Sequence, residues 1–162
     1  MDPVAIQDLL AGSAKMQLAT INPDGSPHLV TMFYAVRDDR IAFWTYRSSQ
    51  KARNLARDPR LTCLVEDGQH YFELRGVQVA GVAEPIEELA AVAEIGQLIS
   101  ARIPGVGGAD QRSSGFSDGE QGGGDGALLR DYVAQAARKR VAYLVRPRRV
   151  SSWDHRLLLT VT

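Results

Sequence analysis

The sequence predicts a single mainly β domain with flanking helices, in which antiparallel strands form a small barrel. The first observation is a series of strand-like segments separated by turn signals or short helices, at residues 16–21, 27–36, 40–46 and 60–66. The second is a long apolar segment, residues 71–83, that Gly76 and Gly81 interrupt. Glycine inside a strand indicates a bulge, a barrel corner or the close approach of another backbone, and a small closed barrel accommodates all three. The 162 residues are enough for one domain with a substantial core.

The chain begins with a short amphipathic helix, predicted over residues 3–10. Asp2 is placed to cap this helix, Pro3 suits its first turn, and Gly12 would end it. The first strand, residues 16–21, alternates in polarity and leads into the strong turn signal Asn-Pro-Asp-Gly-Ser. These signals predict a helix followed directly by a β-hairpin.

The second strand, residues 27–36, is largely apolar on both faces. Leu29 and Phe33 lie on one face, and Val30 and Met32 lie on the other. We therefore expect a strand that is covered on both sides, or one whose second face meets a partner or a ligand.

A short basic helix follows the third strand, within the stretch WTYRSSQKARNLARDP at residues 44–59. Ser49 suits the N-cap of this helix, because a serine oxygen can accept from the unpaired backbone N–H groups of the first turn. The segment carries its cations, Arg47, Lys51, Arg53 and Arg57, ahead of its first acid. Hydroxyls, free N–H groups and cations at a helix start suit a phosphate. An ordinary solvated basic helix explains the same pattern equally well.

The second half of the chain changes from strands to helices and back. The apolar spacing predicts a helix over residues 85–103, another over 127–140, and a last strand over 141–150. Between the helices, residues 105–126 hold nine of the 15 glycines and little apolar surface. Such a composition cannot offset its ordering entropy, so we expect a flexible surface loop within the single domain of residues 1–162. The alternative is a lid that closes through Arg112 or Phe116.

The overall composition excludes several classes of protein. The formal net charge is zero, whereas a dedicated nucleic-acid binder carries a strong basic excess. No apolar run approaches the length of a membrane span and the N-terminus lacks the pattern of a signal peptide, so we expect a cytoplasmic protein. The single cysteine, Cys63, lies in an apolar strand and is expected to be buried and inert.

No set of catalytic side chains stands out. His28, His70 and His155 are widely separated, and no pair has the spacing of zinc ligands, so no metal site is predicted. The GxSxG elbow of serine hydrolases is missing and the acids are scattered. The pattern favours a protein whose reactive group is a bound cofactor, or a binding module without turnover.

The run from Ala19 to Asp67 resembles the flavin and deazaflavin split β-barrel proteins of the pyridoxamine-5′-phosphate-oxidase-like superfamily. The resemblance is carried by DGSPH, a strand with VTMFY, a strand ending in T-x-R-S, a K-x-x-N-L helix, and D-P-R before the next strand. The later GVAEPI and the terminal V-x-x-W-D-H-R are similar to the actinobacterial branch that uses the deazaflavin coenzyme F-420. The resemblance covers most of the chain outside residues 105–126.

The resemblance implies an FMN-binding-type split β-barrel of about six antiparallel strands, assembled as a homodimer with cofactor sites at its interface. The cofactor-binding residues that it implies are Val30, Thr31, Met32, Trp44, Thr45, Arg47, Ser49, Lys51 and Asn54. The first three would lie beside the ring system, the next two near the ribityl chain or phosphate, and Ser49 and Lys51 would bind phosphate. Residues 153–156 would complete the pocket from the other subunit. Met32 and Trp44 are more often core residues, and Asn54 suits a capping or packing role.

The function that the resemblance implies is a deazaflavin-dependent oxidoreductase, which transfers a hydride between reduced F-420 and an unsaturated small molecule. The polyglutamate tail of F-420 would be met by Arg53, Arg57, Arg60 and the basic run at residues 146–149. One alternative is an FMN-dependent oxidoreductase on the same fold. Another is a carrier that holds F-420 or a flavin without turnover. The substrate and the proton donor are not predicted.

Overall fold

The computed structural model describes residues 1–104, 106 and 122–159. Its elements in chain order are α1 (Pro3–Gly12), β1 (Lys15–Ile21), β2 (Pro27–Phe33), β3 (Ala35–Arg37), β4 (Arg40–Tyr46), α2 (Gln50–Arg57), β5 (Arg60–Asp67), the 3-10 helix η1 (Tyr71–Glu73), β6 (Arg75–Ile86), α3 (Leu89–Ser100), α4 (Gly122–Ala137), β7 (Arg140–Asp154) and the 3-10 helix η2 (His155–Leu159). The described strands form one seven-stranded sheet in the order β2-β1-β5-β6-β7-β4-β3, and every pair is antiparallel. The predicted mainly β fold with flanking helices is confirmed.

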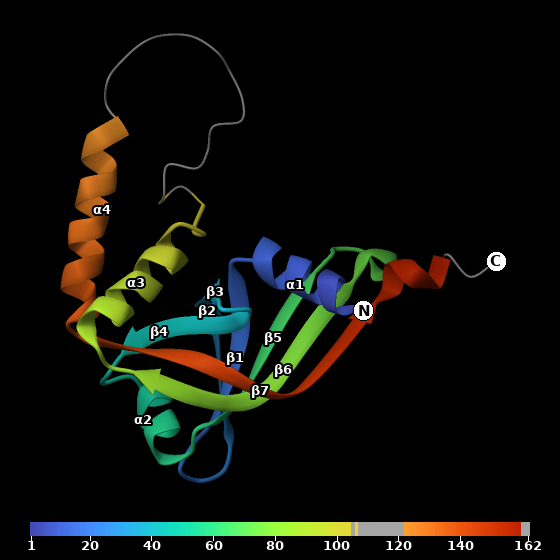
Figure 1. The fold of residues 1–162 in the computed structure, drawn as a ribbon. Coiled ribbons are helices and arrows are strands. Elements are labelled where there is room, and N and C mark those ends of the chain that lie inside the picture. The colour runs from blue at the N-terminus through green and yellow to red at the C-terminus, as the bar shows by residue number, and fades with distance from the viewer. Residues whose placement is uncertain (105, 107–121, 160–162) are drawn as a thin grey trace.

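The sheet curls into a half-barrel (Figure 1), because its two outermost strands are neighbours in the chain. Only Tyr34 separates β2 from β3. Tyr34 is fully buried; its N–H donates to the carbonyl of Ala14 at 3.1 Å, and its hydroxyl donates to the carbonyl of Leu10 at 2.6 Å. The predicted continuous strand over residues 27–36 is therefore wrong. At Tyr34 the chain passes from one edge of the sheet to the other, and the buried ring fixes that passage.

The two glycines of β6 have the roles that their positions predict. A Cβ on Gly81 would lie 2.3 Å from the carbonyl oxygen of Arg146 in β7, and the β6–β7 register shifts between Ala80 and Gly81. A Cβ on Gly76 would lie 2.1 Å from the ring of Trp153. The strand therefore contains one irregularity and two close approaches, each of which excludes a side chain.

Two clusters of buried apolar side chains hold the fold together, and β4 belongs to both. Ile41 and Phe43 belong to the cluster of the barrel interior, together with residues of α1, β1, β5, β6 and β7. Ala42 and Trp44 belong to the cluster that attaches α3 and α4 to the sheet. Because β4 is buried on both faces, the residues at its end are held in fixed positions.

The late helices differ from the prediction at their starts. β6 continues to Ile86, so α3 begins only at Leu89, where the Glu88 carboxylate caps it by accepting from the N–H groups of Ala90 and Ala91 at 3.0 and 2.8 Å. α4 begins at Gly122, ahead of the predicted start at residue 127, so the helix includes the end of the predicted glycine-rich loop. Residues 105 and 107–121 of the predicted glycine-rich loop, which include Arg112 and Phe116, lie outside the described residues.

The C-terminal strand is longer than predicted and ends far from α3 and α4 (Figure 1). β7 extends to Asp154 in place of residue 150. The segment predicted as the start of a strand at Tyr71 is instead η1, which packs on η2: the rings of Tyr71 and His155 are 4.7 Å apart, and the N–H of His155 donates to the carbonyl of Leu74 at 2.8 Å. No helix of the described residues is both long and apolar enough to cross a membrane.

Candidate functional site

The end of β4 and the start of α2 bring two hydroxyls together. Ser49 is the N-cap of α2, as predicted, and its Oγ accepts from the N–H of Ala52 at 3.2 Å. The same oxygen lies 3.1 Å from Oγ1 of Thr45, the buried threonine near the end of β4. This hydrogen bond ties the helix start to the strand, so the two hydroxyls have a fixed relative position.

Lys51 lies in the first turn of α2 and is partly buried. Partial loss of hydration lowers the pKa of its ammonium group, because burial disfavours the charged form. Within the described part of the chain, no carboxylate forms an ion pair with Lys51. Its charge is therefore available to a ligand.

A cavity of about 530 Å³, here named the Lys51 cavity, opens between the sheet and the late helices. Its lining residues are Thr31, Met32, Phe33, Trp44, Thr45, Tyr46, Lys51, Ile99, Ser100, Ile103, Val106, Leu129, Tyr132 and Arg140. They come from β2, β4, α2, α3, the turn after α3, α4 and β7. Most are apolar or aromatic, with Lys51 and Arg140 as the cations and no acid among the described residues that line it. An apolar site with a few polar groups is typical of small-molecule and cofactor binding.

Trp44 forms a fixed wall of the Lys51 cavity. A Cβ on Gly96 of α3 would lie 2.4 Å from Cζ3 of the Trp44 ring, so only glycine lets the helix approach the ring this closely. The guanidinium carbon of Arg140 lies 4.2 Å from a ring centroid of Trp44. Helix and arginine together hold the indole in one position.

The structure brings five of the nine residues predicted for the cofactor onto the Lys51 cavity. These five are Thr31, Met32, Trp44, Thr45 and Lys51. Ser49 is joined to them through its hydrogen bond with Thr45. Val30 does not line the Lys51 cavity; it is partly buried and packs against the barrel interior. Arg47 lines a separate cavity between α2 and the ends of β6 and β7.

Asn54, the remaining predicted residue, does not line the Lys51 cavity. It is fully buried, and its Nδ2 donates to Oγ1 of Thr20 and to Oδ1 of Asn22, each at 3.1 Å. Its Oδ1 accepts from Nε2 of Gln50 at 2.9 Å. The side chain therefore anchors α2 to β1 and to the turn after it, which is the packing role that the sequence left open.

Sequence reasoning missed the residues that reach the Lys51 cavity from distant segments. Arg140 lies opposite Tyr46 in the pairing of β7 with β4. Ile99 and Tyr132 arrive on α3 and α4. No local pattern marks these residues, because only strand pairing and helix packing bring them beside β4.

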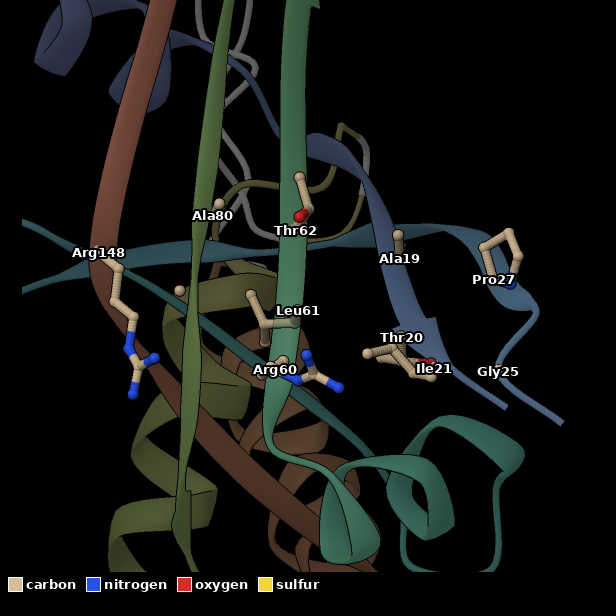
Figure 2. A pocket seen from close by; sticks show the side chains of 11 residues that line it. Ala19, Thr20, Ile21, Gly25, Pro27, Arg60, Leu61, Thr62, Ala80 and Arg148 are labelled. Carbon is tan, nitrogen blue, oxygen red and sulfur yellow. The ribbon is translucent and has the colours of Figure 1, made fainter. Parts of the chain in front are cut away.

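A second cavity of about 390 Å³, here named the Arg148 cavity, lies on β1, β5, β6 and β7 (Figure 2). Ala19, Thr62 and Ala80 form a row across three paired strands. In Figure 2 Arg148 lies beyond the Ala80 end of this row, and Arg60 lies on the same strand as Thr62. Nη2 of Arg60 is 2.6 Å from an oxygen of Asp58, and hydrogen bonds from Arg60 lower the pKa of that carboxyl to about 2.

The arginines predicted for a polyglutamate tail are largely engaged by the protein. Arg53 donates to the Ser48 carbonyl at 2.9 Å, and Arg146 pairs with Glu84 at 2.8 Å. Arg57 donates to the Ile21 carbonyl. None of these arginines lines the Lys51 cavity. Among the residues that the structure describes, no group of three His, Cys, Asp or Glu side chains comes together as a metal site.

The sequence matches the family described as pyridoxamine 5′-phosphate oxidase over residues 3–154. Comparison with curated proteins gives no match. A solved structure of a conserved hypothetical protein from Mycobacterium tuberculosis is 40% identical, with 98% of this chain and 88% of that chain covered and a TM-score of 0.80.

Two more distant structures share the fold. An F420 reductase is 22% identical, with 90% of this chain and 94% of that chain covered and a TM-score of 0.61. The heme storage protein HutZ from Vibrio cholerae is 14% identical, with 94% and 93% covered and a TM-score of 0.63. At these identities the likeness shows the fold alone.

Proposed function

We propose that this chain, which belongs to the pyridoxamine 5′-phosphate oxidase family, is an oxidoreductase that binds coenzyme F-420 in the Lys51 cavity. With this coenzyme it would transfer a hydride to or from an unsaturated small molecule. The observation that carries the proposal is the cavity itself, on which five of the cofactor residues implied by the resemblance meet. The fold is compatible with this coenzyme, because an F420 reductase shares it.

The residues of the Lys51 cavity fit a ligand that has a phosphate at one end and a planar ring at the other. The hydroxyls of Thr45 and Ser49 and the ammonium of Lys51 gather where α2 begins. Met32 and Ile99 supply apolar walls. The volume of about 530 Å³ lies within the ~300–1,000 Å³ of typical small-molecule sites.

The protein's part in the reaction is to bind, orient and shield, because F-420 or a flavin supplies the hydride-transferring ring when bound. Lys51 and the Thr45–Ser49 hydroxyl pair would hold the phosphate and so set how far the ring reaches along the cavity. The fixed indole of Trp44 would cover one side and exclude water. These roles require rigid positions, which the doubly buried β4 provides.

We also propose that a second copy of the chain covers the Lys51 cavity. Tyr46 and Tyr132 line this cavity and remain 50% and 61% exposed. β7 begins beside the cavity at Arg140 and ends at Asp154, so residues 153–156 reach a cavity of this kind only from a partner. Light scattering coupled to size-exclusion chromatography tests this arrangement, and a protein that stays monomeric at micromolar concentration would contradict it.

The cofactor is tested by fluorescence titration of the purified protein with F-420 and, separately, with FMN. Tight F-420 binding and weak FMN binding would support the proposal, and the reverse would assign the site to a flavin. Tight binding without turnover across a panel of enones and nitroaromatics would favour a carrier. Binding of neither cofactor would refute the proposed function. The same titration with Lys51→Met tests whether the ammonium of Lys51 binds the cofactor. Lys139→Met is the control for this variant, because it removes an exposed lysine outside the cavity lining.

A further inference from the structure

Arg140 packs against two aromatic rings that line the Lys51 cavity. It is the first residue of β7 and lies directly opposite Tyr46 of β4. Its guanidinium carbon is 4.2 Å from a ring centroid of Trp44 and 4.6 Å from that of Tyr46. A guanidinium lies well on aromatic faces because it is planar and weakly hydrated. Both rings also line the cavity, so the charged group is at its surface.

The hydrogen-bonding capacity of Arg140 is not fully used by the protein. Its Nε is buried and has no acceptor among the described residues. No carboxylate of the described residues pairs with Arg140, whereas Arg75 and Arg146 pair with acids at 2.9 and 2.8 Å. Folded proteins seldom leave a buried donor without a partner, so the guanidinium is incompletely bonded by the protein. The Nε atom is closed to the cavity, so a ligand oxygen would reach Arg140 through its other N–H groups, on a residue that lines the cavity and that no carboxylate of the described residues neutralises.

The charge of the Lys51 cavity points to the same kind of ligand. Lys51 and Arg140 line one apolar cavity, and none of the described residues around it is acidic. Hydrogen bonding from Arg140, together with its positive charge, lowers the pKa of the Tyr46 phenol. Cations against an apolar wall attract anions more strongly than they do in bulk water.

We propose that Arg140 is an anion-binding residue of the Lys51 cavity, which acts with Lys51 on a ligand that carries phosphate or carboxylate oxygens. The inference rests on the proposed function, because it concerns the same cavity. The oxygens belong either to the cofactor phosphate or to an anionic substrate. Both present a pair of oxygens that a guanidinium can bind through two parallel N–H groups.

The test compares Arg140→Gln and Arg140→Lys with Arg138→Gln, which changes an exposed arginine two positions earlier. Affinities are measured for matched ligands with and without phosphate: FMN against riboflavin, and F-420 against its phosphate-free chromophore. If Arg140 contacts the cofactor phosphate, Arg140→Gln lowers the affinity for the phosphate-bearing ligand about 10- to 100-fold and leaves the affinity for the phosphate-free ligand nearly unchanged. Arg140→Lys should retain part of the affinity, and Arg138→Gln all of it.

The substrate arm uses benzoate and its neutral isostere benzamide, with thermal protection as the readout. If benzoate protects the wild-type protein against thermal unfolding, benzamide does not, and Arg140→Gln loses the protection by benzoate, the anion bound by Arg140 belongs to a substrate. Inorganic phosphate is titrated against the cofactor-free protein as well, so that the role of Arg140 can be judged even where wild-type protein binds neither cofactor and the proposed function fails. The inference is overturned if Arg140→Gln changes none of these affinities. It is also overturned if Arg140→Gln lowers the affinity for riboflavin as much as the affinity for FMN, because Arg140 would then only support the rings of Trp44 and Tyr46.

Discussion

Substituting Gly96 by alanine should displace the Trp44 ring into the Lys51 cavity while the fold persists. A Cβ at this position in α3 would lie 2.4 Å from Cζ3 and 2.5 Å from Cη2 of the indole. Ordinary contacts of a Cβ begin near 3.4 Å, so the ring must withdraw by about 1 Å. The indole is rigid, and the cavity that it lines offers the space into which it can move.

Two opposing effects set the change in the free energy of unfolding. Alanine is favoured over glycine inside a helix by ~1 kcal/mol. Inserting a methyl group into a filled contact costs ~1–3 kcal/mol. The net destabilisation is therefore roughly 0–2 kcal/mol, which lowers the melting temperature of a domain of this size by about 0–8 °C. Ligand binding should suffer more than stability, because the ring moves into the volume that the ligand needs.

The displacement can be measured directly, because Trp44 is 9% exposed and the second tryptophan, Trp153, is 37% exposed. In a Trp153→Phe background, the emission of Trp44 should shift when Gly96 becomes alanine. The affinity for the bound cofactor should fall by about tenfold or more, and the melting temperature by a few degrees. Gly12→Ala is the control, because a Cβ there meets nothing within 4 Å.

The opposite result would be a rise in melting temperature of several degrees with unchanged Trp44 emission and unchanged affinity. Helix propensity alone would then describe the substitution. The close contact between Gly96 and Trp44, and with it the fixed wall of the cavity, would be refuted.

Three further predictions address the anion site and the core. Lys51→Met should weaken binding of FMN or F-420 by ~1.5–3 kcal/mol in fluorescence titration and leave the melting temperature unchanged; equal affinity would remove Lys51 from the site. Tyr34→Phe removes the hydroxyl that donates to the Leu10 carbonyl at 2.6 Å and should cost ~0.5–1.5 kcal/mol in urea unfolding. Burial raises the pKa of Tyr34 from 10.0 to about 12, so the unfolded chain ionises first. The contribution of Tyr34 to the free energy of unfolding is therefore fully present below pH 10 and should be lost between pH 10 and about 12. If the free energies of unfolding of wild type and Tyr34→Phe changed in parallel over this pH range, the assignment would be contradicted. Burial also raises the pKa of the Cys63 thiol to about 12, so iodoacetamide should label it only through unfolding; rapid labelling of the folded protein at pH 8 would show that the thiol is accessible.

Local signals in the sequence were sufficient for the caps, the turns and the strand positions near them. Asp2 accepts from the N–H of Ala5 at 2.8 Å, and Ser49 accepts from that of Ala52 at 3.2 Å. Gly25 adopts a φ of +84° in the predicted turn. Each of these features depends on atoms within a few residues, so the chain itself specifies it. The motif around Lys51 likewise located one end of the candidate site.

The long-range arrangement depended on contacts that no local pattern records. The break at Tyr34 exists because its ring and hydroxyl are buried against α1, and the late start of α3 exists because β6 stays paired with β7 as far as Ile86. Arg140 reaches the Lys51 cavity only because β7 pairs with β4 and sets it opposite Tyr46. The sequence by itself thus determined the caps, the turns and the residues at the start of α2. Only the tertiary structure decided which distant side chains complete the cavity, because pairing and packing join residues that are far apart along the chain.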